Sequence, residues 1–155
     1  MRVFSWLEYR LLKPDDTFVS IYHYQSIELE QILARRECEF FVKEGVTYKQ
    51  TSSAVEDDIH IIYVKEHEHG PKEQAEDDHR EITLEVRELN SLRGHPILFV
   101  SSFYTHLDVL SYIGTVYTYY NGWEWERDSA EIDEDRSVYS LYVTKTGVTY
   151  EGGKA

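Results

Sequence analysis

The sequence predicts one α+β domain in which a mainly antiparallel β-sheet carries two short helices, at about 26–36 and 105–113. Apolar and polar residues alternate along many short segments, which is typical of strands with one solvated face. Only two segments combine a helical apolar stripe with capping residues. The 155 residues suit a single domain, and we expect it to span 1–150, with a frayed tail at 151–155.

Ten segments are candidate strands, and we expect six to nine strands in the sheet. The clearest case is 81–87, where Ile82, Leu84 and Val86 alternate with polar residues. The other expected strands cover residues 4–12, 18–24, 40–42, 46–49, 59–65, 97–103, 116–120, 123–127 and 138–143. Because the polar stretch 67–79 joins 59–66 to 80–88, we expect those two strands to pair as an antiparallel hairpin with a long acidic loop.

Asn121-Gly122 predicts a second, tighter hairpin, because both residues tolerate the positive φ that a type I′ turn requires. The turn fixes which residues face each other across the strands. The expected pairs are Tyr120 with Trp123, Thr118 with Trp125, Val116 with Arg127, Tyr119 with Glu124 and Tyr117 with Glu126. We expect the aromatic face of this hairpin to pack on the core.

Each expected helix has a start signal. Ser26 can cap the first, with Arg35 and Arg36 in its last turn, where cations complement the helix dipole. Thr105 and Asp108 form a variant of the capping box at the start of the second. The apolar residues expected to face inward are Leu29, Ile32 and Leu33 in the first helix, and Leu107, Leu110 and Ile113 in the second.

The net charge of −13 is concentrated in two stretches. Glu56–Glu81 holds ten acidic and three basic residues, a balance of −7. Glu124–Arg136 holds seven acidic and two basic residues, a balance of −5. We expect each stretch to be a loop between antiparallel strands, and two such loops make a local field that a partner can sense.

Several function classes are disfavoured. Cys38 is the only cysteine, so neither an intramolecular disulfide nor a cysteine-based zinc site is expected. No glycine-rich phosphate loop occurs, no cofactor is expected, and the lone Arg35-Arg36 pair argues against direct nucleic-acid binding. The sequence shows neither a signal peptide nor an apolar run that would span a membrane, so we expect a cytoplasmic protein.

Two local clusters have alternative interpretations. His67 and His69 lie in an acidic, histidine-containing loop that is open to metal binding or pH sensing, although no known ligand spacing is matched. His106 lies at the start of the second helix, where an anion can bind. Capping already explains Thr105 and Asp108, and no nucleophile and base are paired at a catalytic spacing. No metal site and no catalytic residue is therefore assigned.

The leading hypothesis is an acidic interaction module, of the inhibitor, immunity or nucleic-acid-mimic type, that binds a basic protein partner through both acidic loops. The carboxylates expected to bind it are Glu73, Glu76, Asp77, Asp78, Glu124, Glu126, Asp133, Glu134 and Asp135. The alternative is a small-ligand domain whose pocket is lined by Tyr120, Trp123, Trp125 and His106. Solvated acidic loops without a partner are a further interpretation.

Overall fold

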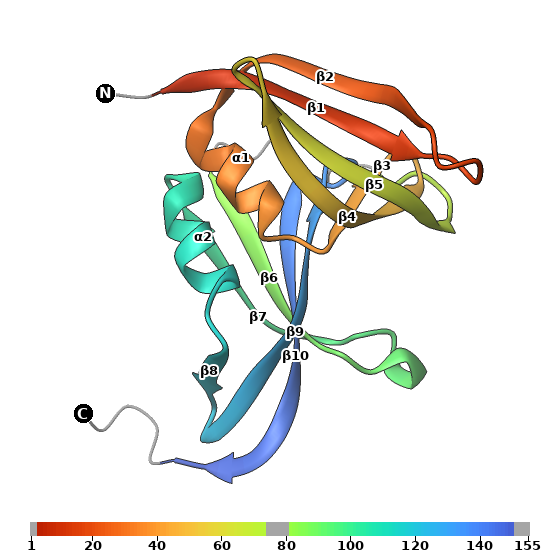
Figure 1. Cartoon of the computed structure of the whole chain (residues 1–155). Coiled ribbons are helices and arrows are strands. Elements are labelled where there is room, and N and C mark those ends of the chain that lie inside the picture. Colours follow the sequence, from red (N-terminus) through yellow and green to blue (C-terminus); the bar gives the residue numbers. More distant parts are fainter. Residues whose placement is uncertain (1–2, 74–80, 151–155) are drawn as a thin grey trace.

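A ten-stranded mixed sheet and two helices make up the fold, as seen in a computed structural model that describes residues 3–73 and 81–150 (Figure 1). The elements in chain order are β1 (Phe4–Leu12), β2 (Phe18–Glu28), α1 (Leu29–Arg36), β3 (Phe40–Lys43), β4 (Val46–Glu56), β5 (Ile59–His69), β6 (Ile82–Glu88), a 3₁₀ turn η1 (Ser91–Arg93), β7 (Ile97–Phe103), α2 (His106–Ile113), β8 (Tyr117–Tyr120), β9 (Trp123–Asp133) and β10 (Val138–Thr149). The predicted α+β class and two short helices are confirmed.

The strand order is β2-β1-β5-β4-β3-β9-β10-β6-β7, and β8 pairs with β9. Most neighbours are antiparallel, but β1 with β5, β3 with β9 and β10 with β6 are parallel. The short β3–β9 pairing joins the two halves of the sheet. Figure 1 shows β1, β2, β4 and β5 in the upper half, and both helices on one side of β6, β9 and β10.

The expected hairpin between 59–66 and 80–88 is wrong. Strand β5 pairs with β4 and β1, and β6 pairs with β10 and β7. Two causes explain the difference. Ile61, Ile62 and Val64 are all buried, so β5 has partners on both edges and cover on both faces. Asp57 and Asp58 both have positive φ, 46° and 67°, and make the tight turn that pairs β5 with the preceding strand.

The Asn121-Gly122 hairpin is confirmed. The two residues have φ values of 53° and 83°, and the β8–β9 register matches the predicted one from Tyr117–Glu126 to Tyr120–Trp123. The predicted loop that follows this hairpin is wrong. The acidic stretch after Glu124 is not a loop, because β9 runs on to Asp133 and only a short turn separates it from β10.

The helix starts differ from expectation in one case. Strand β2 continues to Glu28, so Ser26 lies in a strand and α1 begins at Leu29 without a side-chain cap. The cause is Ile27, which is buried within the β1–β2 pairing. In α2 the predicted cap is confirmed, since Asp108 N–H donates to Thr105 Oγ1 at 3.1 Å.

The core is formed by both helices and by strands of both halves of the sheet, β1, β3, β4 and β5 as well as β6, β9 and β10. Among its fully buried residues are Ile32 from α1, Val109 and Ile113 from α2, Leu84 from β6 and Leu141 from β10. Leu107, which was expected to face inward, is 52% exposed. Because side chains alternate along a strand, the neighbours of these core residues point to the opposite face of the sheet.

Candidate functional site: an acidic pocket on the polar face of the sheet

The face of β6, β9 and β10 that points away from the helices is polar. Ser140 on β10 is in register with Glu85 on β6 and with Glu131 on β9. One step along the sheet, Tyr142 is in register with Arg87 and Ser129. Glu85 and Ser140 are buried. Buried polar groups need hydrogen-bond partners. Some side chains of the row Glu85–Ser140–Glu131 find these partners in the row Arg87–Tyr142–Ser129.

Two turns, β9–β10 and β3–β4, hold the first acidic stretch on this face. Asp135, in the β9–β10 turn, accepts hydrogen bonds from the backbone N–H groups of Glu44 and Gly45, at 2.8 and 2.9 Å. Gly70, just after β5, donates its N–H to Gly45 O at 2.7 Å. The end of β5, with Glu68, is thereby held beside the β9–β10 turn.

Gly45 is required at this junction. Its φ of +78° lies in the left-handed region, and a Cβ at this position would meet Gly70 O at 2.3 Å. Only glycine combines that backbone conformation with so close an approach of another backbone. The junction therefore depends on one residue of the β3–β4 turn.

A pocket of about 550 Å³ lies where the turns meet the polar face. We call it the acidic pocket. Its lining includes six carboxylates, those of Glu68, Glu73, Glu85, Glu131, Asp133 and Asp135, and two guanidinium groups, those of Arg87 and Arg136. Glu68 and Glu73 come from the first acidic stretch, and three of the others come from the second. The two stretches thus share one site with a clear excess of negative charge.

Both arginines of the pocket are held by carboxylates. Arg136 forms ion pairs with Glu85 and Glu73 and lies 4.0 Å from an Asp133 oxygen. Arg87 donates to the same Glu85 at 2.9 Å. Burial alone would raise the pKa of Glu85, but hydrogen bonds from Arg136 and Arg87 outweigh it and lower that pKa. Glu85 is therefore a charged anchor for both guanidinium groups.

Glu131 has a different environment. Within residues 3–73 and 81–150 no lysine or arginine forms an ion pair with it, and its one side-chain hydrogen bond comes from Tyr142 OH, at 3.3 Å. Burial and the nearby Asp133 raise the pKa of Glu131 to about 7. Burial also raises the pKa of Asp133. Both carboxyls therefore lie where burial disfavours their charged form.

A smaller hollow of about 230 Å³ adjoins the acidic pocket, and both are lined by Thr47, Glu68, Glu131 and Tyr142. The hollow adds the side chains of Phe40, Leu89 and His95. The His95 and Tyr142 rings meet edge to face, with centroids 5.5 Å apart. The carboxylates of the pocket are therefore bordered by apolar and aromatic surface.

Glu134 serves a different purpose, on the helix side of the sheet. It accepts hydrogen bonds from Tyr24 OH at 2.7 Å and from Arg35 Nη2 at 2.8 Å, and Lys43 Nζ lies 3.0 Å away. Burial would raise its pKa, but the Arg35 charge and these hydrogen bonds lower it. Arg35 is itself 4% exposed. Glu134 thus neutralises a buried cation.

The other carboxylates expected to bind a partner are distributed over the molecule. Glu73, Asp133 and Asp135 lie in the acidic pocket. Glu124 and Glu126 lie near the opposite end of β9, about 30 Å and about 23 Å along the strand from Asp133 at roughly 3.3 Å per residue. The remaining three, Glu76, Asp77 and Asp78, lie outside the described residues.

Of the four residues of the expected aromatic pocket, Tyr120, Trp123 and Trp125 lie together on the β8–β9 hairpin, and His106 lies apart from them. Trp125 is 5% exposed in the core, and Tyr120 and Trp123 pack against that core. Lys145 Nζ lies 4.1 Å from the centroid of the Trp123 ring. His106 contacts Gln31 and Tyr139 and lines a separate pocket of about 520 Å³, with Arg35 and Glu134.

Sequence reasoning missed Glu85, Glu131 and Tyr142 as site residues. The alternation in 81–87 places Glu85 on a polar face and predicts that this face is solvated, whereas Glu85 is buried. The signal available was the polar alternation of Ser129, Glu131 and Asp133, which continues the strand pattern of β9.

No protein-family model, no curated protein and no solved structure matches this chain. In the part of the chain that the structure describes, no group of three or more His, Cys, Asp or Glu side chains is arranged to hold a metal ion. Over the same residues, no helix has the length and apolar content to cross a membrane.

Proposed function

We propose that this chain is an acidic binding module that recognises a basic protein partner and seats one of its cationic side chains in the acidic pocket. One observation carries the proposal: five carboxylates from the two acidic stretches, together with Glu85, line a single concave site that holds two guanidinium groups. A cleft lined by one sign of charge concentrates ligands of the opposite sign and speeds their association.

We also propose a cytoplasmic location and no direct contact with nucleic acid, as the composition favours.

The carboxylates at the rim and at the base of the pocket have different tasks in this proposal. The side chains of Glu68 and Glu73 are 72% and 67% exposed, so they steer an approaching partner. Glu131 and Asp133 lie deeper, where the dielectric is lower and a paired charge counts for more. Glu134 takes no part in partner binding, because it already forms ion pairs with Arg35 and Lys43.

A small organic cation is the second candidate ligand. The volume of about 550 Å³ favours it, because cavities of this size hold small ligands. Such a ligand would compete with a basic peptide for the same carboxylates.

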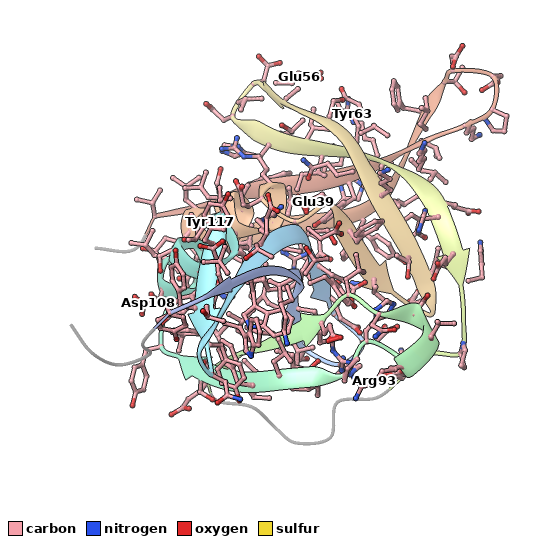
Figure 2. All side chains as sticks on the ribbon, turned by 90° about the horizontal axis from the view of Figure 1, so that it is seen from below. Glu39, Glu56, Tyr63, Arg93, Asp108 and Tyr117 are labelled. Atoms are coloured by element: carbon pink, nitrogen blue, oxygen red, sulfur yellow. The ribbon has the colours of Figure 1, made fainter. Side chains whose placement is uncertain are left out.

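The experiment measures binding of a nine-residue peptide with four arginines among glycines and serines, by calorimetry at 25, 150 and 500 mM NaCl. The test variant is Glu68→Gln/Glu73→Gln. Its matched control is Asp57→Asn/Asp58→Asn, which removes the same charge from the β4–β5 turn. Figure 2 shows Glu56, beside that turn, on the opposite side of the view from Arg93 in the β6–β7 connection.

We expect the test variant to bind the peptide about ten-fold more weakly than the native chain at 25 mM NaCl, and the control to stay within about two-fold. Affinity should fall steadily with salt. Equal losses in both variants, or an affinity that ignores salt, would contradict the proposal. A small cation is favoured instead if spermidine binds in the pocket and the peptide does not.

A further inference from the structure

We infer that Glu131, together with the Tyr142 ring, selects the guanidinium group of an arginine side chain as the cation bound in the acidic pocket. The inference rests on the proposed function and names its ligand more closely. It follows from the position of Glu131 at the boundary of the acidic pocket and the adjoining hollow, both of which it lines with Tyr142.

Glu131 has the capacity to accept more hydrogen bonds. A carboxylate has about four acceptor positions on its two oxygens, and within residues 3–73 and 81–150 the one side chain that donates to Glu131 is Tyr142, through its OH. In the same row of the sheet, Ser140 Oγ is buried without a hydrogen-bond partner among the described residues. Ser140 Oγ is thus a buried polar atom without a partner, and the neighbouring Glu131 carboxylate can accept more hydrogen bonds than Tyr142 OH supplies.

The pocket already holds the group we propose. The guanidinium of Arg136 lies among carboxylates of Glu73, Glu85 and Asp133. A guanidinium suits such a place because its planar fork meets two carboxylate oxygens at once and is weakly hydrated. An ammonium is more strongly hydrated and loses more when it leaves water.

Flat rings beside Glu131 strengthen the preference for arginine. Tyr142 and His95 border the adjoining hollow, and Phe40 is in register with Glu131 on the neighbouring strand. Guanidinium groups stack on aromatic faces as well as pairing with carboxylates. An arginine that reaches Glu131 would therefore lie beside an aromatic surface.

Binding should also release a proton. The charged or titratable groups that line the two hollows around Glu131 are Asp133, Asp135, Asp128, Tyr142, Glu85, Arg87, Arg136, Glu68, Glu73, His67, His69 and His95. With a pKa of about 7, Glu131 keeps its proton on about half of the molecules at neutral pH. A guanidinium beside it favours the carboxylate, so the proton leaves to the buffer as the ligand binds.

The test compares three nine-residue peptides of the same design, with four arginines, four lysines or four citrullines. Citrulline keeps the shape of arginine and removes its charge. Each is titrated into the native chain, into Glu131→Gln and into Glu126→Gln, a matched control on the exposed part of the same strand. Calorimetry at pH 7 in two buffers of different ionisation enthalpy measures the protons released.

We expect the native chain and the control to bind the arginine peptide at least ten-fold more tightly than the lysine peptide and to release about half a proton. In Glu131→Gln the preference should fall below about three-fold and the proton release should vanish. The citrulline peptide should not bind. Circular dichroism and thermal unfolding confirm that each variant is folded.

Two results would overturn the inference. If arginine and lysine peptides bind equally well, and Glu131→Gln changes neither affinity nor proton release, the selective role of Glu131 is wrong although the proposed function stands. If no basic peptide binds the native chain, the proposed function and the inference fail together.

Discussion

Arg136 Nε lies 3.4 Å from Glu73 Oε2, a contact that joins the two acidic stretches of the chain across 63 positions of sequence. The same guanidinium pairs with Glu85 on β6. Exposed ion pairs of this kind contribute little to stability. The importance of this contact is positional. It lies at the mouth of the acidic pocket and holds carboxylates of both acidic stretches beside each other.

The junction at Gly45 offers a first prediction. Gly45→Ala places a Cβ in a left-handed backbone and against Gly70 O, so we expect a loss of about 2–3 kcal/mol in the free energy of unfolding. Urea unfolding followed by circular dichroism measures it. The control is Gly94→Ala, where φ is +68° and no atom lies within 4 Å of the added Cβ, so only the backbone term of about 1 kcal/mol remains. Equal losses in both variants would show that the Gly45–Gly70 approach is unimportant.

The dependence of stability on pH provides a second prediction. The pKa of Glu131 rises from its ordinary 4.5 to about 7 on folding. Between these values the unfolded chain releases a proton that the folded chain keeps, so this group destabilises the fold increasingly as pH rises from about 4.5 to about 7, and the penalty levels off at higher pH. Glu131→Gln removes that penalty.

We therefore expect Glu131→Gln to gain about 2 kcal/mol more over the native chain at pH 8 than at pH 5.5. Urea unfolding at the two pH values gives the difference directly. A stability difference between the variant and the native chain that is independent of pH would mean that Glu131 ionises normally.

The Arg35–Glu134 pair leads to a third prediction. Glu134→Gln keeps the size of the side chain but leaves Arg35, which is 4% exposed, without its counter-charge. Breaking a buried pair in this way costs about 3 kcal/mol or more. Glu44→Gln is a matched control, because Glu44 is exposed and accepts a hydrogen bond from Tyr22 OH; we expect a change within about 0.5 kcal/mol. If urea unfolding shows similar stabilities for both variants, Glu134 is not needed to neutralise Arg35.

Local features of the fold were predictable from the sequence. The Asn121-Gly122 turn and the Thr105 cap depend on residues within a few positions of each other, and both are confirmed. Strand order depends on pairings between distant segments. The predicted β5–β6 hairpin is wrong because closeness in the chain does not decide the neighbours of β5. Strand β5 is buried on both faces and pairs with β4 and β1 instead.

The site was predictable in part. Charge counting identified Glu73, Asp133 and Asp135, which do line one pocket. The same counting included Glu134, whose partner Arg35 lies 99 positions away, and Glu124, which lies at the far end of β9. Two strand pairings position Glu131 in the site: its register with Ser140 on β10, and the β3–β9 pairing. Neither pairing can be read from a single sequence.

Amide chemical shifts, measured by NMR during titration with the arginine peptide, show whether the two acidic stretches act as one binding site. We expect the amides of Glu68, Gly70, Glu131 and Asp135 to shift along one binding curve, while those of Asp57 and Glu126 stay in place. Shifts confined to one stretch, or two stretches that follow different curves, would contradict one shared binding site.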